Sequence, residues 1–130
     1  MDQNFFTVRG RLPSLNDYVD ACRAHWSKGA ALKKETEELI FWSIKDAVGK
    51  KTCRPVQKPV RVLFVWYEHG LKRDMDNIFS AKKYILDAMQ TAGIIESDDR
   101  KHVVGLGDFI IQTTKGNDRV VVYIWEDDDT

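Results

Sequence analysis

Val60-Arg61-Val62-Leu63-Phe64-Val65-Trp66-Tyr67 is the stretch that decides the fold of this chain. Its β-branched and aromatic side chains predict a β-strand, because such residues fit a pleated, half-buried surface. Gly70 then ends the strand in a loop, and an apolar pattern at helical spacing begins a few residues later. A strand joined through a loop to a helix indicates a protein that mixes α and β structure.

Upstream of this strand, the sequence predicts one more strand and two helices. Residues 4–9 are predicted as the strand. A helix capped by Ser14 is expected to run to about His25, and a longer helix spans about residues 30–48. Gly29 is expected to break the chain between the two helices.

Downstream, one helix and two strands are predicted. Asp76 or Asn77 is expected to cap the helix at its start, and Gly93 at its end. The residues expected on its buried face are Ile78, Ala81, Ile85, Ala88, Met89 and Ala92.

The two last strands are predicted at about 102–112 and 119–125, with a turn at Lys115-Gly116-Asn117-Asp118, so we expect them to form an antiparallel hairpin. The predicted fold class is therefore α/β (α+β), a single domain over residues 1–130 with a mixed sheet packed by helices.

Length and composition agree with one compact domain, because 130 residues that are 43% hydrophobic can bury a core. No run of about 18 apolar residues is present, so no membrane span is expected. Cys22 and Cys53 form no CxxC pair and are expected to be reduced thiols. Because Met1-Asp2-Gln3-Asn4 does not resemble a basic and apolar leader, the predicted location is the cytoplasm.

Charge is distributed unevenly along the chain, although the net charge is zero. Residues 23–61 contain ten basic and four acidic side chains. Such a basic segment is either the solvated surface of a helix or a region that follows a phosphate backbone.

Two acidic pairs are the features of the sequence that indicate chemistry. Asp74-Met75-Asp76-Asn77 follows Lys72-Arg73, and Asp98-Asp99 comes after the helix. Crowded carboxylates repel one another unless a cation neutralises them, and oxygen ligands without a thiolate or imidazole cluster favour Mg²⁺ or Mn²⁺. Basic neighbours suggest a substrate that carries phosphate, so the pattern indicates metal-dependent phosphodiester hydrolysis. Taken singly, Asp74-Met75-Asp76 is also typical of a turn and a helix cap, and Asp98-Asp99 of a solvated loop.

These motifs resemble the RusA family of Holliday junction resolvases, and its prophage-type branch in particular. The resemblance is carried by Arg73-Asp74-Met75-Asp76-Asn77, by Lys83 four residues before Asp87, by Gly93 and by Asp98-Asp99. It extends to Asn4-Phe5-Phe6-Thr7-Val8, Pro13-Ser14-Leu15-Asn16-Asp17-Tyr18, Gly29-Ala30 and Lys33-Lys34, and so covers nearly the whole chain.

The resemblance implies a homodimeric, Mg²⁺-dependent crossover junction endodeoxyribonuclease of bacteria or their phages, which acts on four-way DNA in recombination and repair. It implies metal binding by Asp74, Asp76, Asp98 and Asp99, and it implies Lys83 as the lysine required for cleavage. The side chains expected to contact DNA are Asn16, Arg23, Lys28, Lys33, Lys34, Lys72, Arg73 and Lys82.

The chain departs from the family pattern at the lysine. The spacing between Asp76 and Lys83 is about three residues longer than in the best-known members, and Ser80 stands where the shorter spacing would put the lysine. Lys82 could serve in place of Lys83, so both assignments stay open.

Geometry also leaves the arrangement of the acids open. A helix of about sixteen residues between the two acidic pairs would be about 24 Å long. The pairs converge only if the helix is shorter, if the chain doubles back, or if a partner subunit supplies the second pair. The alternative functions are a junction- or nucleic-acid-binding module that does not cleave, and a flap, fork or RNA nuclease with the same site.

Overall fold

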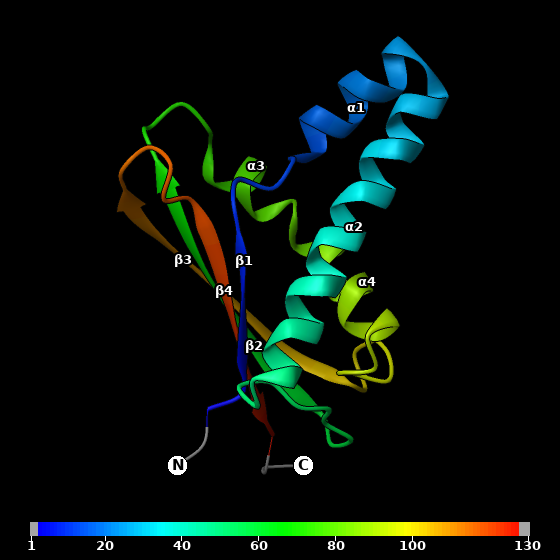
Figure 1. Ribbon diagram of the computed structural model, residues 1–130, viewed down its shortest axis with the longest axis vertical. Helices are drawn as coiled ribbons and strands as arrows, with labels where there is room; N and C mark the ends of the chain where they lie inside the picture. Colours follow the sequence, from blue (N-terminus) through cyan, green and yellow to red (C-terminus); the bar gives the residue numbers. More distant parts are fainter. Residues whose placement is uncertain (1–2, 128–130) are drawn as a thin grey trace.

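The strand β2 (Val60–His69) lies inside a four-stranded sheet, as its composition predicts. The computed structural model describes residues 3–127 of the chain. The other strands are β1 (Phe5–Arg9), β3 (Val103–Thr113) and β4 (Arg119–Glu126), and the order across the sheet is β1-β4-β2-β3 (Figure 1). β2 is parallel to β3 and antiparallel to β4, so the sheet is mixed and the predicted α+β class is confirmed.

The predicted C-terminal hairpin is wrong, because β3 and β4 are not neighbours. β2 lies between them, and β4 in turn lies between β2 and β1. The turn signal at Lys115-Gly116-Asn117-Asp118 correctly marks a reversal of the chain, but the connection passes over the end of β2, where the Nδ1 of His69 lies 2.7 Å from a carboxylate oxygen of Asp118. A turn motif shows where the chain reverses. It does not show which strands pair, since pairing depends on distant side chains.

The first two helices form as predicted, except at their junction. α1 (Leu15–Ala24) begins at Ser14, which forms a capping box with Asp17. α2 (Trp26–Gly49) begins four residues before the predicted start, with His25 as its N-cap. Gly29 therefore lies inside α2 and does not break the chain. A Cβ there would lie 2.2 Å from the Sγ of Cys22, so an alanine would force that thiol out of its present position between α1 and α2.

The predicted third helix is in fact two, α3 (Met75–Phe79) and α4 (Lys82–Thr91). Asp74, rather than Asp76 or Asn77, takes the N-cap position of α3. The break follows Ser80, whose hydroxyl donates to the carbonyl oxygen of Asn77 and accepts from the backbone N–H of Leu15. These bonds to the backbone compete with a continuous helix.

The end of α4 and the buried face of both helices agree with the prediction. Gly93 has φ +77°, and its N–H bonds to the carbonyl of Gln90 while that of Ile94 bonds to Met89, as in a Schellman cap. Every predicted face residue is buried or packed against the core.

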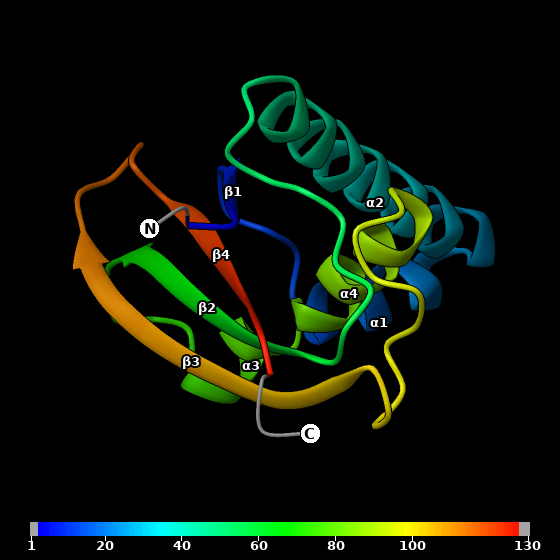
Figure 2. The same cartoon turned by 90° about the horizontal axis from the view of Figure 1, so that it is seen from below.

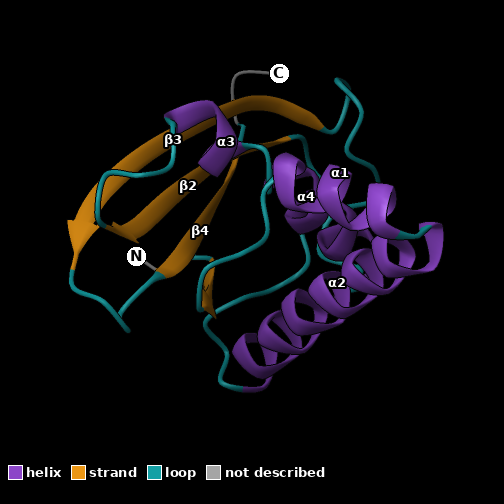
Figure 3. Cartoon of the chain, turned by 90° about the horizontal axis from the view of Figure 1, so that it is seen from above, coloured by secondary structure: helices purple, strands orange, loops and turns teal. Residues whose placement is uncertain are grey.

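The helices cover one face of the sheet only. α1, α2 and α4 lie together on one side (Figures 2 and 3), and α3 contacts the same face, since the ring of Phe79 packs against that of Trp66. The core lies between the layers and includes Phe6, Phe64, Ile40, Ile44, Ile85 and Met89, all of them at 0% exposure. Among the described residues, 3–127, no helix lies on the opposite face of the sheet.

Within residues 3–127, no helix is both long and apolar enough to cross a membrane. Cys22 and Cys53 are both free, as predicted, and burial raises the pKa of the Cys53 thiol to about 11.

Candidate active site

Asp74 and Asp76 face one shared hollow at the start of α3. Alternating residues of an extended chain would point their side chains in opposite directions. Here Asp74 is extended, with φ −69° and ψ 155°, while Asp76 is already helical, and this change of conformation directs both carboxylates to the same side. The hollow has a volume of about 250 Å³, and its other lining residues are Leu15, Asn16, Asn77 and Ser80.

The loop before Asp74 is fixed by a buried ion pair. Glu68, at the end of β2, is only 6% exposed and accepts two hydrogen bonds from Arg73, at 2.9 and 3.2 Å. Arg73 also donates to the carbonyl of Leu12 at 3.2 Å, and Arg11 lies 2.8 Å from Glu68. Two arginines thus neutralise one buried carboxylate, and they tie the chain on both sides of the hollow together.

Sequence reasoning missed Glu68. The sequence did carry a signal for this residue. The alternation of β2 predicts that position 68 is buried, and a buried carboxylate requires a partner of opposite charge. The DNA contact predicted for Arg73 would have to compete with this pair, because its side chain is 15% exposed and already neutralised.

Lys83 lies beside the hollow rather than in it. Its Nζ is 2.6 Å from Asp98 and 3.0 Å from Asp87, and the second of these is an i,i+4 ion pair on α4. The hydrogen bond to Asp98, and then the one to Asp87, raise the pKa of Lys83, so it is an ammonium at neutral pH. A neighbouring hollow of about 220 Å³ is lined by Lys83 and Lys33 and shares Leu15 and Ser80 with the first.

Lys82 turns the other way, towards the sheet. Its Nζ is 2.5 Å from Asp108 on β3 and 5.6 Å from the ring centres of Phe64 and Phe79. Asp108 also accepts a hydrogen bond from the indole of Trp66. Of the two lysines left open by the sequence, Lys83 is therefore the one next to the acidic hollow.

Asp99 is engaged in a local pair with His102. Its carboxylate lies 2.7 Å from Nδ1 of His102. This hydrogen bond is the main cause that lowers the pKa of Asp99 and raises the pKa of His102. Both side chains are substantially exposed to solvent, so the pair is local and weak.

The two residues of the second acidic pair have different partners: Asp98 is bonded to Lys83, beside the hollow of Asp74 and Asp76, whereas Asp99 is bonded to His102. Asp74 and Asp76 follow the end of β2 at His69, whereas Asp99 directly precedes β3, which begins beside Val60 at the start of β2. Within residues 3–127, no group of three or more histidine, cysteine or acidic side chains is arranged to hold a metal ion. The predicted set of four carboxylates is not assembled in a single subunit.

The donor set of the hollow alone still fits Mg²⁺. Magnesium in phosphate-processing sites is held by one or two carboxylates together with substrate phosphate and water, rather than by a full protein cage. Asp74 and Asp76 supply two carboxylates, while Asn16 and Asn77 add amide oxygens to the lining.

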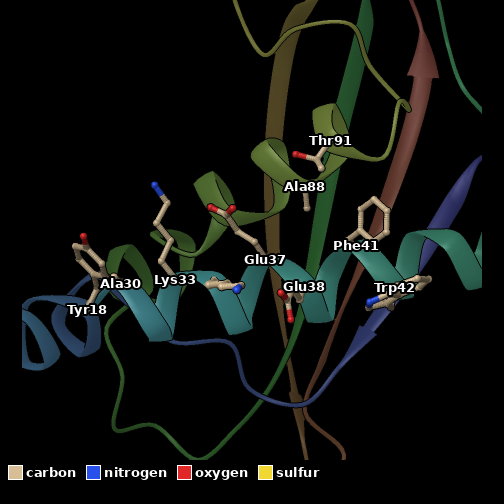
Figure 4. A pocket seen from close by; sticks show the side chains of 10 residues that line it. Tyr18, Ala30, Lys33, Glu37, Glu38, Phe41, Trp42, Ala88 and Thr91 are labelled. Carbon is tan, nitrogen blue, oxygen red and sulfur yellow. The ribbon is translucent and has the colours of Figure 1, made fainter. Parts of the chain in front are cut away.

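The predicted DNA-contacting side chains lie in different surroundings. Asn16 lines the acidic hollow, Lys72 is exposed in the loop before it, and Arg23 and Lys28 are exposed near the junction of α1 and α2. Lys33 and Lys34 line a larger hollow of about 680 Å³ along α2, beside Glu37 and Glu38. Figure 4 shows Lys33, Glu37 and Phe41 on the side of α2 that faces α4. Glu35, Glu37 and Glu38 follow the two lysines there, so the basic character of α2 is diluted.

No protein-family model matches the chain, and no curated protein matches it either.

Proposed function

We propose that the protein is a Mg²⁺-dependent, structure-selective endonuclease that resolves four-way DNA junctions by paired phosphodiester hydrolysis. The observation that carries this proposal is the shared hollow of Asp74 and Asp76, with an ammonium group beside it. The activity itself is the one implied by the resemblance to the RusA family.

The residues of the hollow have different roles in hydrolysis. Bound Mg²⁺ would supply Lewis-acid activation of water and charge stabilisation. Asp74 and Asp76 hold the cation, and Asn16 and Asn77 orient the phosphate at the rim of the hollow. Lys83 is an ammonium at neutral pH, so it stabilises negative charge rather than acting as a base.

A homodimer is part of this proposal. A four-way junction presents two symmetry-related strands, which suits an enzyme with two-fold symmetry. The Nζ of Lys83 lies 2.6 Å from Asp98, so the chain doubles back along α4 towards the first acidic pair, and a site completed within one subunit competes with one shared across the dimer.

A second candidate is a junction-binding module without cleavage activity. Ser80 favours it, because this hydroxyl lines the acidic hollow where a family member with the shorter spacing would have its lysine. A nuclease for flaps or forks would share the same site and differ only in substrate.

Metal removal separates these candidates. The full-length protein is incubated with a labelled four-way junction, a flap, a fork and a linear duplex, in Mg²⁺ and in excess EDTA. We expect symmetric nicks at the junction that EDTA abolishes and that the duplex does not show. Junction binding without any cut in Mg²⁺ or Mn²⁺ would identify the binding module. Faster cleavage of flaps or forks than of the four-way junction would identify flaps or forks as the substrate.

A further inference from the structure

The hollow of about 680 Å³ along α2, here called the α2 groove, is lined by charged and aromatic side chains in a regular order. Lys33, Glu37 and Phe41 are four residues apart, so they follow one another at steps of about 6 Å on the side of α2 that faces α4 (Figure 4). The neighbouring row of lining residues repeats this order with Lys34, Glu38 and Trp42. Each row thus runs from an ammonium group through a carboxylate to an aromatic ring.

Glu37 is the residue of this groove whose hydrogen bonding is incomplete. Its Oε1 is buried and has no hydrogen-bond partner among residues 3–127. A buried oxygen without a donor costs free energy, so this atom calls for a partner that the described chain does not supply. The last torsion of a glutamate side chain is broad and two-fold, so either oxygen can turn into the groove. The α2 groove therefore lacks a hydrogen-bond donor at the level of Glu37.

The α2 groove is continuous with the acidic hollow of the candidate active site. The hollow of about 220 Å³ between them shares Leu15 and Ser80 with the acidic hollow, and it shares Tyr18 and Lys33 with the α2 groove. Since neighbouring hollows have lining residues in common, the three form one track along α1, α2 and α4. A chain-like ligand that is bound at the acidic hollow can therefore extend into the α2 groove.

We propose that the α2 groove binds one nucleotide of an unpaired DNA strand, and that Glu37 selects guanine as its base. This inference rests on the proposed function, because the strand reaches the groove from the acidic hollow. Proteins that hold an unpaired base stack it on aromatic side chains and bind its phosphate with basic ones. Lys33 and Lys34 lie at the phosphate end of the groove, and the ring of Trp42, which is 66% exposed, lies at the end where the base stacks.

The charges of the groove favour a nucleotide over simpler ligands. An organic acid would leave Glu37 and Glu38 without donors, and an organic amine would be repelled by Lys33 and Lys34. A nucleotide has an anionic phosphate at one end and a neutral base with N–H donors at the other. This order of groups matches the order of side chains along both rows of the groove.

The chemistry of a carboxylate favours guanine among the four bases of DNA. The Watson–Crick edge of guanine carries two adjacent donors, N1–H and N2–H, which match the two oxygens of the Glu37 carboxylate. In cytosine and adenine, the amino group stands next to a ring nitrogen that accepts hydrogen bonds. In thymine, the N–H group lies between two carbonyl oxygens. Each of these acceptors would repel the carboxylate, so guanine is the base that satisfies both of its oxygens.

Fluorescence anisotropy with short labelled single strands tests the inference. The probes are oligothymidylates with one central guanine, adenine or hypoxanthine, the last of which lacks the N2 amino group, and EDTA prevents metal-dependent cleavage. We expect the wild type to bind the guanine probe at least roughly 10-fold more tightly than the other two, and Glu37→Gln to lose this preference. Glu35→Gln, which changes an exposed glutamate of α2 outside the lining of the groove, should keep it. Lys33→Ala should weaken all three probes alike, because a phosphate contact carries no base preference.

Other outcomes overturn the inference. Equal affinity of the wild type for the three probes, no binding of any of them, or a guanine preference that persists in Glu37→Gln rules out this site. Displacement of the guanine probe by an equal concentration of free guanosine monophosphate would make a free nucleotide, and not a strand, the occupant. If Glu37→Gln does not fold, the guanine probe should quench tryptophan fluorescence in the wild type but not in Trp42→Phe, and equal quenching of both overturns the inference. A guanine preference without cleavage of any branched DNA in Mg²⁺ would remove the proposed function and leave the nucleotide site standing. Junction cleavage without a guanine preference would do the reverse.

Discussion

Asp118 joins three separate segments of the chain at the end of β2. Its carboxylate accepts hydrogen bonds from Nδ1 of His69 at 2.7 Å and from Nε of Arg11 at 3.1 Å, and its carbonyl accepts from Gly10. Burial alone would raise the pKa of Asp118, but the bonds from His69 and Arg11 outweigh it and lower the pKa. The folded state therefore favours the ionised form of Asp118.

Replacement of Asp118 should have an effect that depends on pH. A carboxyl whose pKa is lower in the folded state stabilises the fold above its unfolded value of about 3.9, and loses this effect as pH falls through the folded pKa. We expect Asp118→Asn to lower the free energy of unfolding by about 1–3 kcal/mol at pH 7, and by clearly less near pH 3. Urea unfolding at both pH values measures this, with the exposed Asp20→Asn as control. An equal loss at both pH values would show that the charge is not involved.

Two glycines of α2 differ in what surrounds them. Gly29 lies where α1 and α2 approach, and Gly49 lies at the end of α2 in open space. The first glycine therefore leaves room for the thiol of Cys22, whereas the second only weakens its helix.

Alanine at these two glycines should have opposite effects. Gly29→Ala forces its Cβ against Cys22 and should destabilise the protein by about 1–3 kcal/mol. Gly49→Ala should stabilise it by about 0.5–1 kcal/mol. Thermal and urea unfolding of both variants checks the pair, and a neutral Gly29→Ala would mean that α1 can move away from α2 at little cost.

The sequence predicted the positions of helices and strands better than it predicted which strands pair. Periodicity and caps are local, so β2, the Ser14 cap and the Gly93 cap could be located from a few residues each. The hairpin was wrong, because insertion of β2 between β3 and β4 depends on contacts distant in sequence. The break at Ser80 was missed for the same reason, since its hydroxyl binds Leu15, 65 positions away. At the candidate site, the residue types were predictable, but the Glu68–Arg73 support was not.

Across the whole molecule, the acids lie in two places. One pair is at the hollow that follows β2; of the other pair, Asp98 is bonded to Lys83 beside that hollow, and Asp99 pairs with His102 before β3. Either each subunit acts with its own carboxylates, or two subunits combine their pairs. The second arrangement makes each cleavage site depend on both chains.

Mixing two inactive variants distinguishes these arrangements. If sites are shared, a heterodimer of Asp76→Asn and Asp98→Asn retains one intact site. In that site, the Asp98→Asn subunit supplies an intact Asp74 and Asp76, and the Asp76→Asn subunit supplies an intact Asp98 and Asp99. We expect each variant alone to be inactive and the mixture to recover single nicks, in proportion to the heterodimer formed. No recovery in a mixture shown to contain heterodimers would confine each site to one subunit.

Single-turnover cleavage of a labelled four-way junction in Mg²⁺ by Asp76→Asn tests the central claim most directly. The matched control is Asp46→Asn, which removes an exposed carboxylate paired with Lys50 on the surface. The account predicts that Asp76→Asn folds and binds the junction but cleaves at least roughly 100-fold more slowly, while Asp46→Asn cleaves like the wild type. Cleavage by folded Asp76→Asn at the wild-type rate would contradict the assignment of this hollow as the active site.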